Sequence, residues 1–383
     1  MPNFKERHSG RETNIFTEVF ELASANGALN LSQGSPDYAM DPRLKDFLIE
    51  AAHEDMNPYA SNFALPYLKQ SLIRFNAARS NPLLLKDHEI SIVPGATYAI
   101  YVAFSTFIER DDEVIIFEPC YDTYIPAIEI MRAKAVCVAL NENFEVDFNL
   151  LQDSITEKTK AIIVNSPQNP TGKIWGQQEW SNLWDLIKET DIVVISDEVY
   201  DLICYDGKPF ISAFHHPFIK ERCFCIYSFE KMFHVSGWKA SYVIASEECT
   251  KAFRQIHQYL TFTINLHSQH AIARYLDVFD VNGHQYFLQQ KRDLMIKSFS
   301  GLPLEAIHIA EGGLFQTYRY STTASSFDDA AFAFNLIRKA KVASIPYSAF
   351  YSDGRSSGHI RFCFAKKDET IERAAEMLHQ YWK

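Results

Sequence analysis

The sequence predicts an α/β protein with a mostly parallel sheet covered by helices on both faces, together with a smaller α+β domain. Two observations predict this class. From about residue 89, short apolar runs rich in β-branched residues alternate with helical patterns, which is the order of elements in a parallel sheet. After about residue 250 there is a long helical stretch, followed by a second strand-and-helix group from about residue 305 to the end.

The elements follow from local patterns in chain order. Asp41 and Pro42 have the residue types of a helix N-cap and first helical position, and Leu44, Phe47, Leu48 and Ala51 continue at helical spacing. The predicted strands of the main sheet are Glu89–Val93, Glu113–Phe117, Ala135–Leu140, Ala161–Val164, Asp191–Ser196, Cys223–Ser228 and Ser241–Ala245.

Composition narrows the class of function. The 383 residues are 47% hydrophobic, and the formal net charge is -11. Nucleic acid is therefore not expected as a partner, since phosphate backbones need clustered Lys and Arg. We expect no signal peptide from the polar N-terminus and no membrane span, because no run reaches about 18 apolar residues. The seven scattered cysteines form no Cys-x-x-Cys pair, which favours a reduced, cytoplasmic setting.

Residues that could bind a ligand or take part in catalysis follow the predicted strands, where ligands of open α/β sheets bind. Pro94-Gly95-Ala96-Thr97 precedes a helical pattern, an arrangement that suits an anion, although such a segment is more often a plain turn. Tyr121 could stack on a planar ring or pack under a loop. Asn169 lies in a rigid Asn/Pro turn that could aim its amide outward or form a surface turn.

Charged residues follow the next two strands. Asp197 ends a buried strand, where a carboxylate needs a cation or hydrogen-bond donors, and Tyr200 lies close enough to share its site. Lys231 follows another apolar strand, where lost solvation lowers the pKa of an amine and makes it a nucleophile toward aldehydes. A lone lysine there is more often a solvated surface residue. Together, however, these groups suit a planar phosphorylated pyridine aldehyde, pyridoxal 5′-phosphate.

The motifs resemble those of the class I aminotransferases, which are pyridoxal-phosphate enzymes of fold type I. The motifs are Asn169-Pro170-Thr171-Gly172, Asp197-Glu198-Val199-Tyr200, Ser228-x-x-Lys231 and Gly237-Trp238-Lys239. The likeness runs from Leu31-Ser32-Gln33-Gly34 to His359-Ile360-Arg361-Phe362, nearly the whole chain, and is strongest to the methionine and kynurenine/glutamine aminotransferases. It implies a seven-stranded sheet, with a small domain from residues 1–40 and 281–383 and a large cofactor domain from residues 41–280.

The resemblance also implies roles for the cofactor-binding residues. Lys231 would be the Schiff-base lysine, and Asp197 would pair with the pyridine nitrogen. Tyr200 and Asn169 would bind the ring's phenolic oxygen, and Tyr121 would stack on the ring. The phosphate would be held by the remaining matched residues, which are Gly95, Ala96, Thr97, Ser228 and Lys239. In this family a tyrosine of the partner subunit in a homodimer completes the cradle, and Tyr59 of Asn57-Pro58-Tyr59 matches it.

Substrate residues follow from the same resemblance. Arg361 would hold the α-carboxylate of the amino acid as a bidentate fork, assisted by Asn169 and the backbone of Gly34. Phe262 would supply an apolar wall to the neighbouring subunit. The expected reaction moves an amino group from an apolar or aromatic amino acid (methionine-like, or Phe, Tyr, Gln or kynurenine) to a 2-oxo acid. One departure is Glu230, which stands where the family commonly has glycine.

Alternatives remain at this level. A carbon–sulfur β-lyase would use the same Lys231, and a non-catalytic module could bind the cofactor, although regulators of that kind carry a DNA-binding domain for which no basic segment is present. His257, His267 and His270 could suggest a metal, but no carboxylate or cysteine completes a ligand set. We therefore expect no metal.

Overall fold

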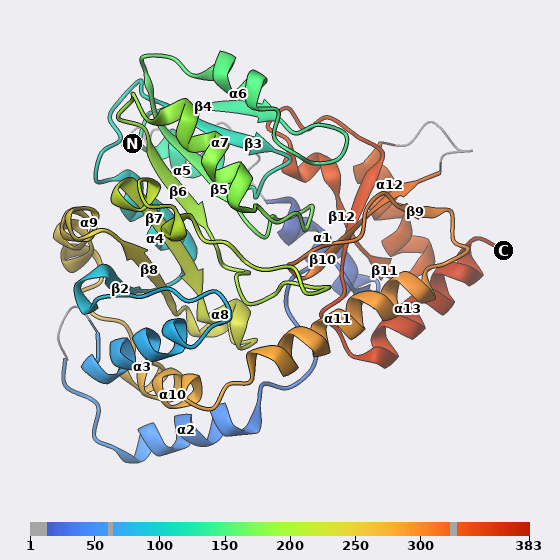
Figure 1. Cartoon of the computed structure of the whole chain (residues 1–383). Coiled ribbons are helices and arrows are strands. Elements are labelled where there is room, and N and C mark those ends of the chain that lie inside the picture. The colour runs from blue at the N-terminus through green and yellow to red at the C-terminus, as the bar shows by residue number, and fades with distance from the viewer. Residues whose placement is uncertain (1–13, 60–63, 322–327) are drawn as a thin grey trace, which may run out of the picture.

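The central element of the fold is a seven-stranded sheet with the strand order β2-β8-β7-β6-β5-β3-β4. The computed structural model describes residues 14–59, 64–321 and 328–383 (Figure 1). The strands are β2 (Ile90–Val93), β3 (Glu113–Glu118), β4 (Lys134–Ala139), β5 (Thr159–Asn165), β6 (Val193–Asp197), β7 (Cys223–Ser228) and β8 (Ser241–Ala245). Only β8 runs antiparallel to its neighbours, β2 and β7. The predicted mostly parallel sheet is confirmed, with every strand end within two residues of its expected position.

Helices cover both faces of this sheet. Alternate residues of β5 separate the two layers, since Ile162 belongs to one apolar cluster and Ile163 to the other. The first layer includes α2 (Pro42–His53), α3 (Pro66–Ala77), α6 (Phe148–Ser154), α7 (Gln177–Ile187) and α10 (Leu266–Leu276). The second includes α4 (Ala96–Phe104), α5 (Tyr124–Ile130) and α9 (Glu247–Leu260). In α2 the Asp41 side chain accepts a hydrogen bond from the Arg43 amide at 2.8 Å, which confirms the predicted cap.

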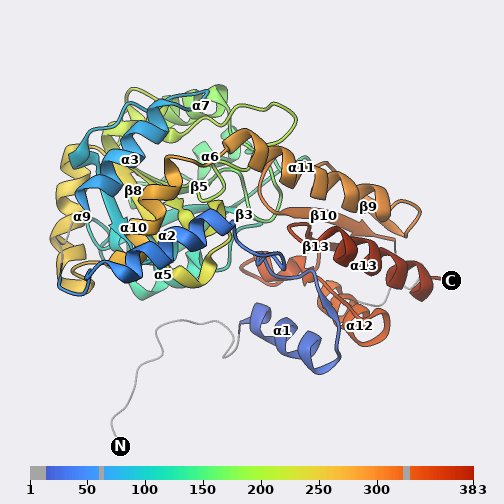
Figure 2. The ribbon, with the colours of Figure 1, turned by 90° about the horizontal axis from the view of Figure 1, so that it is seen from below.

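A second, antiparallel sheet forms from the C-terminal part of the chain. Its order is β12 (Ile345–Pro346), β13 (His359–Cys363), β10 (Phe315–Tyr320) and β9 (Leu304–Ala306). The helices of this part are α11 (Val281–Ser298), α12 (Asp329–Asn335) and α13 (Asp368–Tyr381). Figure 2 shows α11 running from the main sheet toward this second group.

The N-terminal segment joins this second group rather than the main sheet. Helix α1 (Ile15–Ala25) lies beside the C-terminal elements in Figure 2. Strand β1 (Leu29–Asn30) pairs in parallel with β11 (Val342–Ala343), and the amide of Cys363 donates to the carbonyl of Leu31 at 2.7 Å. Residues 1–13, for which we expected no signal peptide, lie outside the described residues. None of the described helices combines the length and apolarity needed to cross a bilayer.

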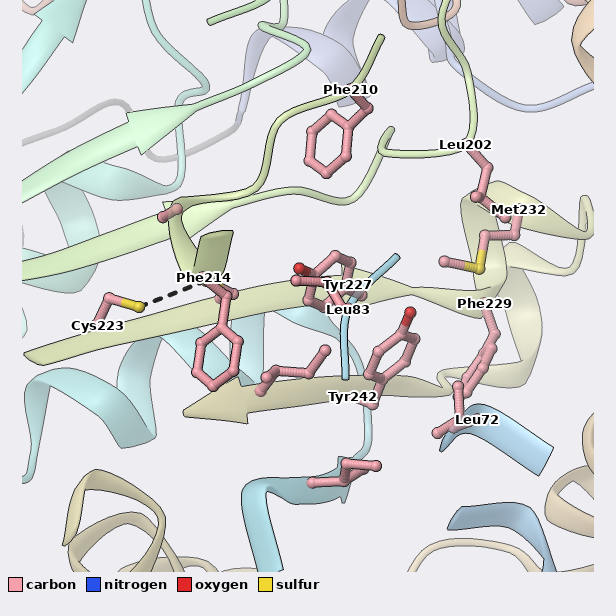
Figure 3. Close-up of a cluster of buried hydrophobic side chains, with 14 of the residues drawn as sticks. Leu72, Leu83, Leu202, Phe210, Phe214, Cys223, Tyr227, Phe229, Met232 and Tyr242 are labelled. Atoms are coloured by element: carbon pink, nitrogen blue, oxygen red, sulfur yellow. Dashed lines mark hydrogen bonds between the residues drawn. The ribbon is translucent and has the colours of Figure 1, made fainter. Parts of the chain in front are cut away.

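An aromatic core fixes the segment that carries Lys231. Helix α8 (Phe229–Met232) starts directly after β7, and the Phe229 ring lies 4.9 Å from the Tyr242 ring and 6.1 Å from that of Phe233 (Figure 3). Phe229 is fully buried. Fully buried aromatic rings contribute strongly to packing, so the position of Lys231 depends on this core.

Replacing Phe229 by alanine should remove that support. Truncating a buried aromatic ring costs roughly 3–5 kcal/mol of unfolding free energy. Phe229→Leu keeps most of the volume and should cost less than about 1.5 kcal/mol. Chemical denaturation of the cofactor-free protein measures both, and equal losses for the two variants would contradict the packing role.

Candidate active site

A cleft of about 500 Å³ opens at the carboxyl ends of the main-sheet strands and is closed on its other side by the C-terminal sheet. Most of the predicted site residues line it: Gly34, Ala96, Thr97, Tyr121, Asn169, Asp197, Tyr200, Ser228, Lys231, Lys239 and Arg361. Sheet register explains part of this convergence, because Asn165 of β5 pairs with Asp197 of β6, which in turn pairs with Ile226 of β7. Parallel strands thus deliver the residues at their ends to one edge.

One end of the cleft has the features of an anion cradle. Gly95 caps α4 with a φ of 103°, a conformation that favours glycine. A Cβ at Gly95 would lie 2.8 Å from the Lys239 ammonium nitrogen, so the absence of a side chain lets this cation approach the helix N-terminus. Ser228, only 2% exposed, lies at the end of β7 nearby in the cleft. Backbone amides, a hydroxyl and an ammonium are the donors that a phosphate group requires.

Asp197 lies buried in the middle of the cleft. One carboxylate oxygen accepts a hydrogen bond from the Tyr124 hydroxyl at 2.6 Å, and the other accepts one from the Val199 amide at 3.4 Å. Burial raises the pKa of Asp197 to about 6, against these bonds and the attraction of Lys231. A cationic ring N–H placed against this carboxylate would favour its charged form, so the donor set fits a protonated pyridine.

Lys231 has the properties of a nucleophilic amine. Burial lowers its pKa from the ordinary value, while the carboxylate of Glu230 opposes this effect. Lys239 and Arg361 add to the lowering by charge repulsion. A neutral amine can attack a carbonyl carbon or accept a proton, so the environment prepares Lys231 for either step.

Arg361 presents a buried cation that forms no ion pair with the described residues, although the Asp122 carboxylate attracts it from a greater distance. The residue is 1% exposed; its Nη1 donates to Asn169 Oδ1 at 2.6 Å and its Nη2 to the carbonyl of Ser32 at 2.8 Å. Its Nε has no hydrogen-bond partner in the described part of the chain. Burial lowers the pKa of Arg361 to about 10. A buried guanidinium with a free donor fits a carboxylate ligand.

The sequence reasoning missed residues in and behind the cleft, among them Tyr124, Phe315 and Asp122. Tyr124 donates to Asp197, and its position three residues after Tyr121 at a helix start was the available signal. Phe315 lies under the Arg361 guanidinium at 3.7 Å, and its ring would be 2.8 Å from a Cβ on Gly34. Asp122 lines the cleft and accepts a hydrogen bond from the Asn14 side chain.

Three predicted residues do not line this chain's cleft; Gly95 lies just behind it against Lys239, and Tyr59 and Phe262 lie on the surface. Tyr59 is 86% exposed, and its ring meets that of Phe262 edge-on at 5.4 Å. Neither residue lines the cleft described above, so their predicted contribution to a partner subunit stays a prediction.

The histidines considered for a metal have other contacts. His257 shares a hydrogen bond with Tyr98 at 2.8 Å, and His270 shares one with Tyr67 at 2.9 Å. Within residues 14–59, 64–321 and 328–383, no three His, Cys, Asp or Glu side chains gather as a metal site would need.

The fold and the cleft together define an α/β enzyme that holds a phosphorylated pyridine cofactor and a carboxylate-bearing substrate. Residues 26–378 match the family model of the class I and II aminotransferases, and the chain belongs to this family. It is a pyridoxal-phosphate-dependent transaminase, as its resemblance predicted.

Named relatives agree with this assignment. The chain is 35% identical to the methionine aminotransferase of Escherichia coli (strain K12), over 96% of each chain. It is 30% identical to kynurenine–oxoglutarate transaminase 3 of Mus musculus, covering 98% of this chain and 90% of the relative. The solved structure of YbdL from Escherichia coli, described as having a methionine aminotransferase function, superposes with a TM-score of 0.93 at 34% identity, covering 99% of this chain and 100% of that one.

The environment of Asp197 predicts a pH effect on stability. Its pKa of about 6 in the folded protein exceeds the ordinary 3.8, so the folded state keeps a proton that the unfolded chain loses, and stability falls as pH rises through that window. Asp197→Asn removes this effect. The unfolding free energy of the cofactor-free variant minus that of wild type should therefore be about 1 kcal/mol larger at about pH 7.5 than at about pH 5.

Denaturant titrations of both proteins at the two pH values measure this difference. A stability difference that does not change with pH would show that Asp197 ionises normally in the folded protein.

Proposed function

We propose that this transaminase moves the amino group of an apolar or aromatic L-amino acid, methionine above all, to a 2-oxo acid. The observation that carries the proposal is the buried Arg361, whose Nε has no hydrogen-bond partner in the described part of the chain and which shares the cleft with Lys231. The names of the relatives support the methionine-like or aromatic donor. None of the relatives named above is a β-lyase, so nothing favours that alternative.

The cofactor-binding roles are part of this proposal. The phosphate would bind the amides of Gly95, Ala96 and Thr97 together with Ser228 and Lys239, since Gly95 lies against Lys239 and the other four residues line the cleft. Asp197 would hold the ring nitrogen. The Tyr200 hydroxyl and the Asn169 amide would bind the ring's phenolic oxygen, and Tyr121 would cover one face. Bound pyridoxal phosphate supplies an electron sink for the pair left at the substrate Cα.

Proton transfer would fall to Lys231. Because burial lowers its pKa, the amine can be neutral, take the proton from the substrate Cα and return it to the cofactor's C4′ carbon. Such positioned acid–base transfer is worth about 10²–10⁴ in rate. Arg361 would hold the substrate carboxylate beside Phe315, and the Gly34 backbone would assist it, which fixes the Cα within reach of the amine.

Apolar groups near the carboxylate site favour an apolar donor. Phe16, Ile100 and Val199 line the cleft with Phe315, and such walls bind a thioether or aromatic side chain by burying its surface. A second carboxylate, as in aspartate, would need another free cation. Phe262 would add to the wall from the partner subunit.

We also propose a cytoplasmic homodimer in which each chain has a small domain of residues 1–40 and 281–383 and a large domain of residues 41–280. Exposed Tyr59 and Phe262 support shared sites, since both are apolar rings on the surface outside this chain's cleft. The seven free cysteines support a reduced compartment.

The direct test of the activity is spectroscopic. The purified protein with added pyridoxal phosphate should show the near-ultraviolet or visible band of the covalently bound cofactor, and methionine with a 2-oxo acid should perturb it while the products form. Lys231→Ala should lose exchange by more than about 10⁴-fold yet still bind the cofactor non-covalently. A fully active Lys231→Ala enzyme would exclude this lysine as nucleophile.

Mixed dimers test the shared site. Tyr59→Ala alone and Lys231→Ala alone should both be impaired at limiting cofactor. A heterodimer of the two variants should regain one complete site, because the Lys231-intact cleft receives Tyr59 from the other chain. Activity and cofactor affinity per intact site then match wild type. If instead Tyr59 serves its own cleft, the heterodimer contains no complete site and stays impaired.

A further inference from the structure

The Glu230 carboxylate lies inside the proposed phosphate cradle. Its Oε1 is 3.6 Å from the Lys239 ammonium and 3.3 Å from the point where a Cβ of Gly95 would be. Glu230 is 8% exposed, and this oxygen has no hydrogen-bond partner among the described residues. Lys239 lies at ion-pair distance from this oxygen but beyond hydrogen-bond distance, so the oxygen keeps a hydrogen-bonding position open for a further partner.

The position of this carboxylate creates a conflict of charge. The phosphate ester of the cofactor carries close to two negative charges above its second pKa of about 6. Binding at Lys239, whose side chain is largely exposed, would bring that dianion next to an ionised Glu230, and two neighbouring like charges destabilise each other. Because the carboxyl adjoins the Gly95 end of α4, a phosphate held there would lie close to it.

We propose that Glu230 takes up one proton from solvent when the cofactor's phosphate binds, and that the neutral carboxyl then donates a hydrogen bond to a phosphate oxygen. Glu230 is thus a positioning residue that couples cofactor retention to pH. The proposal rests on the phosphate placement given under the proposed function. No step of the amino-group transfer is changed by it.

The groups around Glu230 set the direction of the pH effect. Lys231 on its own helix and Lys239 from the following segment favour the carboxylate, as does the Ala240 amide, but burial outweighs them and raises the pKa of Glu230. From α4 it faces Gly95, which has no titratable group. A bound dianion raises the pKa further. At pH values between the pKa of Glu230 in the free protein and its pKa in the complex, the affinity for the phosphate falls by up to about tenfold for each unit of pH increase.

The test uses pyridoxamine 5′-phosphate, which has no aldehyde and therefore cannot bond to Lys231. Calorimetric titrations of the cofactor-free full-length protein at pH 8, in two buffers of different ionisation enthalpy, count the protons taken up. Because the ring nitrogen also gains protons when it meets Asp197, the difference between the two proteins is the readout. Wild type should take up close to one proton more than Glu230→Gln, and Glu230→Gln should bind about tenfold more tightly or better. Inorganic phosphate should show the same difference, since the phosphate group is responsible.

Asp122→Asn is the matched control, because Asp122 is another acid lining the same cleft but interacts with Asn14 and Arg361. This variant should keep the wild-type proton uptake. Equal uptake by wild type and Glu230→Gln, or loss of uptake in Asp122→Asn, would overturn the role of Glu230. Lys239→Met tests the assumption that the phosphate binds at Lys239. Weaker phosphate binding supports the cradle, while unchanged binding overturns the cradle and this inference with it.

Discussion

The contact on which the rest of the site depends is made by the buried guanidinium of Arg361. It joins three separate parts of the chain, since Nη1 donates to Asn169 in the turn after β5 and Nη2 to Ser32 near the N-terminus, while Arg361 itself lies on β13. Burying an unpaired cation is unfavourable, and the Phe315 face recovers part of that cost through a cation–π contact. A bound carboxylate would offset the rest of the cost of burying this cation. One of the contacts between the C-terminal sheet and the main-sheet part of the chain is therefore left incomplete for substrate.

The rest of the cleft follows the same physical rule, in which burial prepares each ionisable group for one ligand. Burial raises the pKa of Asp197 to about 6 and lowers that of Lys231, so each charged form is less stable in the free protein than in water. A ring N–H would restore the charge of Asp197, and an aldehyde needs the neutral amine of Lys231. An overall charge of -11 is no obstacle, because Lys231, Lys239 and Arg361 bring three cations into the cleft.

Sequence patterns predicted the features that depend on local order. Each strand of the main sheet is a short apolar run bounded by polar or Gly/Pro residues, so its limits were readable to within two residues. Strand ends then placed Asp197 and Lys231. Tyr124 could not be found this way, because its bond to Asp197 joins residues 73 apart in sequence. Phe315 belongs to the other sheet, and no periodicity within either segment reports that the two meet.

The departure at position 230 acquires its meaning only from the fold. In sequence, Glu230 adjoins Lys231, which directs attention to substrate choice and to the reacting amine. In space, its carboxyl interacts with Lys231 and also adjoins Lys239 and the Gly95 end of α4. The lack of a side chain at Gly95 is what allows amides, ammonium and carboxyl to crowd into one place. Under the proposal above, variation at this position acts on the phosphate and on how tightly the cofactor is kept, in addition to its charge effect on the pKa of Lys231.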